Sequence, residues 1–233
     1  MLNRENAAGL NVEFIIDHYG RLVTSICRRM IQDEDKAKDA AQEVWLQVVK
    51  SLPKYQGTAK ISTWLYTVAR RVVMDYAQKE RIYTTRFLKD YFRGEILVSP
   101  DTPDFDRTIW VREMCDKCLT GTLHCLDNEA RLAYLFRDIA QLPYREIAQV
   151  LERRETAVRQ SVTRTRRKLR AFLSDECAIY NPAGTCNCRM KQWVTKVGLP
   201  LEYEKIRRVV QRVNLYKESE KVLPPKNYWE KYL

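Results

Sequence analysis

Histidine and glycine are both scarce in this chain, which has two His and seven Gly among 233 residues. The two histidines, His18 and His124, fall far apart, and no paired-carboxylate constellation stands out, so the nucleophilic and metal-activated sites of DNA enzymes lack their usual groups. No run approaches eighteen uninterrupted apolar residues, and residues 1–10 contain no apolar signal-peptide core. We therefore expect a cytoplasmic protein without membrane insertion. Strand-like alternation is also missing, which favours an all-α fold.

What the chain has in excess is positive charge. It carries 41 Lys and Arg against 30 Asp and Glu, a formal net charge of +11. Such a balance indicates a polyanionic partner, and without a membrane-seeking segment nucleic acid is the favoured one. The excess is concentrated between Glu152 and Ala171, where eight basic residues accompany two Glu. A solvated charged helix usually interleaves acids with bases four residues apart, and almost no acids do so in this segment.

The basic segment forms the second half of a predicted helix-turn-helix. Ile147, Ala148 and Leu151 fall on one face of a short helix, and a polar turn, Glu152-Arg153-Arg154, follows it. A second helix then carries an apolar stripe at helical spacing, made by Val158, Val162 and Leu169. Two short helices of this kind, the second one basic, are typical of proteins that place a recognition helix in the major groove of DNA.

Composition divides the chain into two small helical domains, a linker and a C-terminal extension. Residues 12–82 contain three amphipathic helical segments, and residues 113–174 contain the helix-turn-helix. The predicted apolar face of the first segment consists of Ile15, Tyr19, Leu22, Val23, Ile26, Cys27 and Met30. That of the second consists of Ala41, Val44, Trp45, Val48, Val49 and Leu52, and Pro53 is expected to end this helix. That of the third consists of Trp64, Leu65, Val68, Ala69, Val72 and Val73.

The linker between the two domains, 83–112, holds four acids, two prolines and no base from Glu95 to Asp106. The extension, 175–233, contains three cysteines and a predicted helix with Ile206, Val209, Val210 and Val213 in register.

Two motifs resemble one protein family. Asp39-Ala-Ala-Gln-Glu-Val-Trp45, Tyr55-Gln-Gly57 and Ser62-Thr-Trp-Leu-Tyr-Thr-Val-Ala-Arg70 resemble the promoter-melting domain of bacterial sigma factors of the extracytoplasmic-function (ECF) class. The Tyr144-Arg-Glu-Ile-Ala148 pattern with Arg164-Thr-Arg166 resembles the second domain of the same family, in the same order. The resemblance implies binding to core RNA polymerase and to promoter DNA, in some relatives also to an anti-sigma factor, and no catalytic activity.

The resemblance also assigns roles to residues. The face that docks on the polymerase clamp is made here by Asp39, Gln42, Glu43 and Gln47, for which an ordinary solvated face is the alternative. The residues around the minus-ten element are Lys60, Ser62, Thr63, Tyr66, Arg70 and Arg71, with Trp64 interpreted as a core residue. Arg71 departs from the family, in which Asn is common there. The acidic linker resembles a segment that threads the RNA exit path, and a simple tether is the alternative.

The outward positions of the recognition helix are expected to meet the minus-thirty-five element, with early residues at base edges and later arginines at phosphates. They are Glu155, Thr156, Arg159, Gln160, Thr163, Arg164 and Arg167. Two other classes of protein would account for part of these features. A polymerase-independent helix-turn-helix regulator would leave the Asp39–Arg70 patterns without a use, and it would bind DNA alone. A DNA enzyme would need the catalytic groups that are missing.

The cysteines form a separate pattern. Cys115 and Cys118 have the two-residue spacing with which two thiolates hold one metal ion, and Cys186 and Cys188 make a second close pair. With Cys177 they could complete a site for zinc or another thiophilic metal, which the sigma-factor function itself does not require. A redox-active pair and plain packing are the alternatives, so metal or redox sensing is a hypothesis at this point.

Overall fold

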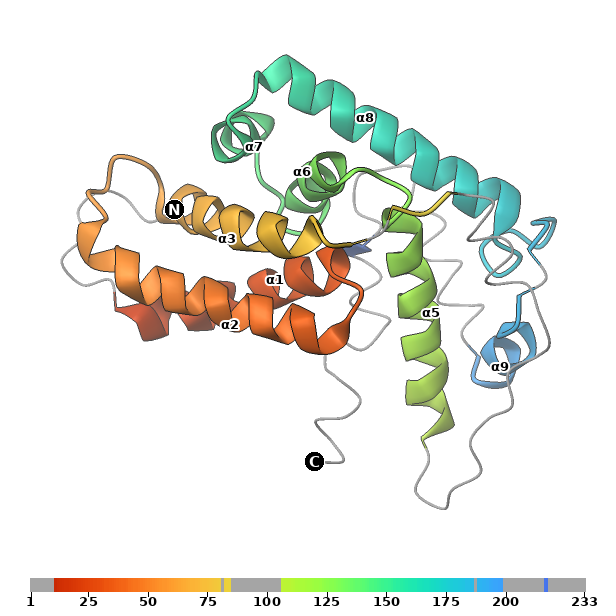
Figure 1. The fold of residues 1–233 in the computed structure, drawn as a ribbon. Coiled ribbons are helices and arrows are strands. Elements are labelled where there is room, and N and C mark those ends of the chain that lie inside the picture. The colour runs from red at the N-terminus through yellow and green to blue at the C-terminus, as the bar shows by residue number, and fades with distance from the viewer. Residues whose placement is uncertain (1–10, 81, 85–105, 187, 199–215, 218–233) are drawn as a thin grey trace. The chain divides into compact units, whose positions relative to one another are not determined.

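The structure, a computed structural model, describes residues 11–80, 82–84, 106–186, 188–198 and 216–217. These residues form helices and turns and contain no β-strand, which confirms the predicted all-α fold (Figure 1). In the described ranges, no helix is both long and apolar enough to cross a membrane. Most of the acidic linker and the predicted helix around residues 206–213 lie outside the described residues.

Two compact units make up the chain. Unit 1 comprises residues 1–81 and 127–163, and unit 2 comprises residues 82–126 and 164–233. Each predicted domain was one continuous stretch of the chain. In the structure, the predicted second domain is divided between the two units. The reason is long-range packing, because helices of the predicted second domain pack on helices of the first inside unit 1. Periodicity reports which face of a helix is buried and not which helix buries it.

Unit 1 begins with three helices packed side by side, α1 (Val12–Met30), α2 (Glu34–Ser51) and α3 (Ile61–Ala77) (Figure 1). The first two start at side-chain caps, since Asn11 Oδ1 accepts from Phe14 N at 2.7 Å and Asp33 Oδ1 accepts from Lys36 N at 3.0 Å. A 3₁₀ turn, Leu52–Lys54, containing Pro53 ends α2 as predicted. The core consists of residues from the predicted apolar stripes, including Ile15, Ile26, Val44, Val48, Leu65 and Val73.

Two further helices complete the described core of unit 1, α6 (Asn128–Asp138) and α7 (Tyr144–Leu151). Arg131, 0% exposed, donates from Nη1 to the carbonyl oxygen of Met30 at 2.9 Å and so joins α6 to the end of α1. Asn128 Nδ2 donates to the carbonyl oxygen of Ala77 at 2.8 Å, at the end of α3. The rings of Tyr66 and Phe136 stand 5.3 Å apart at their centroids. Polar and apolar contacts therefore both hold α6 against the first three helices.

Unit 2 contains α5 (Arg107–Leu123) and α9 (Lys191–Lys196). The predicted linker was too long at its C-terminal end, because Asp106 Oδ1 accepts from the N–H groups of Thr108 and Ile109 at 3.0 and 3.1 Å and starts α5. The tail returns to this helix at Tyr216. Its side chain is fully buried, and its hydroxyl donates to the Leu119 carbonyl oxygen at 2.9 Å.

Candidate nucleic-acid and polymerase interface

The predicted recognition helix is α8 (Glu155–Ala171), which follows α7 after a turn of three residues. Glu152 ends α7 in the left-handed conformation, at φ 55°, and so turns the chain sharply. Val158 and Val162 are buried, which fixes the inward face of α8. The predicted outward residues are exposed on the other face, with Glu155 half-buried: Thr156, Arg159, Gln160, Thr163, Arg164 and Arg167. The structure places these residues on the outward face of α8, and their contact with DNA stays a prediction.

Arg159 makes contacts with two neighbouring side chains at the start of α8. Its Nε and Nη2 donate to Glu155 Oε1 at 2.9 and 2.6 Å, and its guanidinium stands 4.5 Å from the ring centroid of Tyr144. The ring and the carboxylate together hold an exposed guanidinium in one orientation. A guanidinium oriented in advance loses less entropy when it binds a guanine edge or a phosphate.

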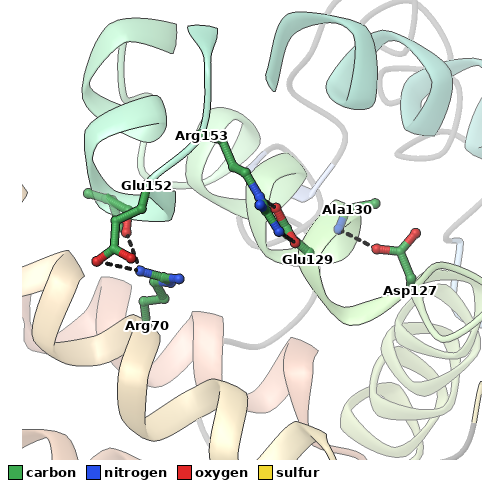
Figure 2. A network of polar contacts seen from close by, with 7 residues as sticks. Arg70, Asp127, Glu129, Ala130, Glu152 and Arg153 are labelled. Atoms are coloured by element: carbon green, nitrogen blue, oxygen red, sulfur yellow. Dashed lines mark hydrogen bonds and ion pairs between the residues drawn. The ribbon is translucent and has the colours of Figure 1, made fainter. Parts of the chain in front are cut away.

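Two predicted cationic contacts at α3 are placed differently, because they pair with carboxylates of α7 and of the turn after it. Lys60 Nζ pairs with Glu146 Oε1, and Thr63 Oγ1 donates to Glu146 Oε2 at 3.5 Å. Arg70 Nη1 lies 3.1 Å from the carbonyl oxygen of Val150 and 3.1 Å from Glu152 Oε1 (Figure 2). Two cations predicted to hold DNA are therefore bound to carboxylates of the predicted helix-turn-helix.

Three other predicted residues of α3 have distinct environments. Tyr66 is 1% exposed and packs between the rings of Tyr19 and Phe136, so it cannot touch DNA in this arrangement. The prediction missed this because Tyr66 was read from the motif, whereas its burial comes partly from α6. Ser62 is half-buried, and Arg71 is exposed.

A pocket of about 420 Å³ opens between α2 and α3. Its lining includes two predicted polymerase contacts, Glu43 and Gln47, with one predicted DNA contact, Arg71. Gln47 Nε2 donates to Glu43 Oε1 at 2.6 Å, which orients both side chains. Trp64, interpreted from the sequence as a core residue, is half-buried and lines this pocket, with its ring centroid 5.2 Å from that of Tyr55. The pocket thus offers an aromatic wall and a cation to a small planar group.

Comparison with known proteins identifies the family to which the chain belongs. Residues 15–82 match Sigma-70 region 2, and residues 116–169 match Sigma-70 region 4, a little more than half of the chain together. The chain belongs to the ECF class of RNA polymerase sigma factors. It binds core RNA polymerase and directs transcription initiation at promoters.

Several distant relatives of this sigma factor match over most of their length. The ECF RNA polymerase sigma-E factor of Haemophilus influenzae is 24% identical over 158 residues, 65% of this chain and 82% of the relative. RNA polymerase sigma factor YlaC of Bacillus subtilis is 24% identical over 161 residues, 69% of this chain and 90% of the relative. The solved structure of CnrH in complex with the cytosolic domain of CnrY shares the fold, with a TM-score of 0.54 at 18% identity over 73% of this chain and 94% of CnrH.

On α2, the sigma factor exposes more than the polar face predicted for polymerase binding. Asp39 and Gln42 are exposed as expected. Leu46 and Val49 are 52% and 49% exposed. They follow Gln42 at the spacing of one helical face, and Val49 had been assigned to the core. Leu46 stands four residues after Gln42 on this face, and it was missed because the face was predicted from its polar residues alone.

A second polar network fixes the turn before α8. Arg153 donates from Nε and Nη2 to the two carboxylate oxygens of Glu129 at 2.5 and 2.8 Å (Figure 2). Asp127 Oδ1 accepts from Ala130 N at 2.8 Å and caps the same helix, α6. The hydrogen bond from Arg153 lowers the pKa of Glu129 below its ordinary value. The turn is therefore attached to α6 by one residue and to α3 by its neighbour, Glu152.

Proposed function

We propose that this sigma factor uses three surfaces in initiation and performs no catalysis of its own. The exposed face of α2 binds core RNA polymerase. The start of α3 with the adjoining pocket binds the melted minus-ten region, and α8 binds the minus-thirty-five element. The support is that each surface carries side chains of the matching chemistry, and that the outward face of α8 is exposed and basic.

The observation that carries the proposal furthest is the pairing of Lys60 and Arg70 with Glu146 and Glu152 in unit 1. A DNA phosphate would compete with these carboxylates for the two cations, because each pairing partly neutralises the positive charge that attracts the phosphate. We infer that unit 1 is a closed form, and that α7 leaves α3 when the sigma factor engages polymerase and promoter. Core polymerase and DNA then bind the open form and shift its population.

An anti-sigma factor is the partner that would act on the same equilibrium. CnrH, whose fold is shared, was solved in complex with the cytosolic domain of CnrY. A protein that held the closed form of this chain would lower its apparent affinity for polymerase by the fraction of open form removed.

Run-off transcription tests the proposed function. Purified full-length chain is added to core RNA polymerase with fragments of genomic DNA, and the transcripts are compared with those of core polymerase alone. We expect defined start sites that depend on both proteins. Sequence-specific binding by the chain alone, without any transcript from the combined proteins, would instead support a polymerase-independent regulator.

The polymerase face is tested by a charge reversal with a matched control. Asp39→Lys should weaken binding to core polymerase because it places a cation where a basic partner docks. Asp35→Lys changes the same charge on the same helix, at a side chain that is 90% exposed, and should bind as the wild type does. Equal losses in both variants would mean that net charge rather than this face controls binding.

A further inference from the structure

The proposed function leaves two features of the chain without a role, the cysteines and an aromatic ring in front of the recognition helix. All seven cysteines are thiols, and among the described residues no group of three His, Cys, Asp or Glu side chains is placed to hold a metal ion. Metal or redox sensing through the cysteines stays a hypothesis from the sequence. The aromatic ring is that of Tyr144, which belongs to the helix-turn-helix motif and contacts a cation of α8.

Tyr144 is the first residue of α7, and its half-buried side chain lies against two guanidinium groups. Arg137 Cζ, from the end of α6, stands 5.1 Å from the ring centroid, and Arg159 Cζ, from α8, stands 4.5 Å from it. Arg137 Nη1 also donates to the carbonyl oxygen of Leu142 at 3.0 Å, in the loop before α7. The ring of Tyr144 therefore contacts cations both from the helix before α7 and from the helix after it.

Glu155 holds the guanidinium of Arg159 by one edge only. Arg159 Nε and Nη2 both donate to Glu155 Oε1, at 2.9 and 2.6 Å, and these two nitrogens form the side edge of the guanidinium fork. The end edge of the fork consists of Nη1 and the second N–H of Nη2, and Glu155 does not use it. Two parallel donors therefore remain for a ligand, on a side chain that is 57% exposed.

Two parallel N–H donors match the edge of a guanine base in the major groove. Guanine presents O6 and N7 there as neighbouring acceptors, and a bidentate arginine is their commonest specific partner. A phosphate also accepts two N–H bonds, but attraction to a phosphate depends strongly on positive charge. The carboxylate of Glu155 partly neutralises that charge and leaves both end-edge donors in place, so this arrangement favours a base edge over a phosphate.

We propose that Tyr144 and Glu155 are positioning residues that hold Arg159 end-on for one guanine of the minus-thirty-five element. The proposal rests on the proposed function of α8, and it replaces the base contact expected of Glu155 from the sequence. The ring restricts rotation of the guanidinium plane, and the carboxylate sets the direction of its end edge. Arg159 then loses less side-chain entropy when the base binds. The preference for guanine at one position depends in this way on a residue of α7.

The test is the selection of DNA by the holoenzyme. Core RNA polymerase and the full-length chain are incubated with DNA fragments of random sequence, and sequencing of the bound fragments gives the base preference at each position of the upstream element. Wild type should prefer guanine by about tenfold at one position, and Arg159→Ala should lose this preference. Tyr144→Ala should reduce the same preference by roughly threefold to tenfold and leave the other positions unchanged, whereas Tyr144→Phe, which keeps the ring, should select as wild type does.

A double mutant separates positioning from folding. If Tyr144 acts through Arg159, Tyr144→Ala in an Arg159→Ala background should change nothing further at the guanine position. Glu155→Gln should also lower the guanine preference. Because it frees the charge of Arg159, its binding to unrelated DNA should tighten and depend more steeply on salt. Circular dichroism of each variant confirms that it has folded.

Arg167→Ala is the control, because it removes an exposed arginine of the same helix and should weaken binding to all sequences alike. The proposal is overturned if Tyr144→Ala keeps the guanine preference, or lowers it equally with and without Arg159. It is also overturned if Glu155→Gln changes the preference at a different position, since Glu155 would then read a base itself. A wild type that selects no upstream sequence would instead contradict the proposed function of α8, so the two failures are distinguishable.

Discussion

Helices α3 and α8 both carry predicted promoter contacts, but they hold their charges in opposite ways. Lys60 and Arg70 are bound to carboxylates that arrive from α7 and from the turn after it, about eighty residues later in the chain. Arg159 on α8 is bound to Glu155 of its own helix, and Gln160 is exposed. The predicted upstream-element surface is therefore exposed in this structure. At the predicted minus-ten surface, Arg70 is half-buried against the turn after α7, and Lys60 is exposed but paired with a carboxylate of the same molecule.

The difference teaches where regulation can act on this sigma factor. A helix whose cations face solvent responds to DNA directly, and salt weakens it by screening and counterion release. A helix whose cations are already paired responds first to whatever removes the pairing partner. The four predictions below break or sharpen this contrast, beginning with the largest expected effect.

Removing the buried attachment of α6 should have the largest effect. Arg131→Ala leaves the Met30 carbonyl oxygen without this donor and a cavity in the core of unit 1, at a cost of about 3 kcal/mol in the free energy of unfolding. Urea unfolding followed by circular dichroism measures it. Arg145→Ala removes the same charge from an exposed site and should cost little. If the two variants unfold at the same urea concentration, α6 is not held as described.

The exposed surface of α8 should separate base reading from phosphate binding. Arg159→Ala and Gln160→Ala should each weaken minus-thirty-five binding by about 1–3 kcal/mol and relax the base preference. Arg167→Ala should weaken all sequences alike and reduce the salt dependence. Holoenzyme binding to a panel of substituted promoters at two salt concentrations measures both. Equal, sequence-independent losses in all three variants would make α8 a phosphate-binding helix.

The closed form should weaken when its carboxylate is neutralised. Glu146→Gln removes the charge that holds Lys60, so a larger fraction of the chain is open and holoenzyme formation should tighten by roughly threefold to tenfold. Fluorescence titration with core polymerase measures the change. Asp35→Asn removes a paired carboxylate of the same unit, exposed on α2, that contacts no predicted DNA contact, and it should leave the affinity unchanged. Tighter binding in both variants, or in neither, would remove Glu146 from this role.

Much of the fold could be predicted from the sequence, because helical periodicity and caps are local. The stripes of α1 and α8 were expected, and so was the stop at Pro53. The end of the linker was missed because the cap at Asp106 lies in an acidic run that looks like a tether. The exposed Val49 was missed because a helical stripe does not reveal its own edges.

The sequence predicted which types of residue make up the candidate site, but only part of how they are arranged in space. The outward residues of α8 follow from the positions of Val158 and Val162, and they were found. The pairing of Lys60 with Glu146 joins residues far apart in the sequence, and no local pattern contains it. Tyr66 shows the same limit, since part of its burial comes from Phe136 of α6. Contacts between residues far apart in the sequence decide which charged side chains are paired or buried. A single sequence does not reveal these contacts.

The smallest effect concerns pH. The pKa of Glu129 is lowered by the hydrogen bond from Arg153, so this pair stabilises the folded state above the ordinary value of 4.5. The stabilisation is lost as pH falls through the folded-state pKa. Glu129→Gln should therefore be slightly less stable than wild type at neutral pH, and the difference should vanish in acid. Thermal unfolding between pH 3 and pH 7 measures it, and a difference that stays constant over this range would contradict the ion pair.

The distance between α3 and α7 tests the central claim most directly. Spin labels on unnatural amino acids at Gln78, at the C-terminal end of α3, and Gln149, on α7, report it by pulsed electron resonance without using the native thiols. Both positions are exposed in unit 1. A single short distance is expected in the chain alone, and a clearly longer one in the complex with core polymerase and promoter DNA. An unchanged distance in that complex, with transcription intact, would contradict the closed-to-open account.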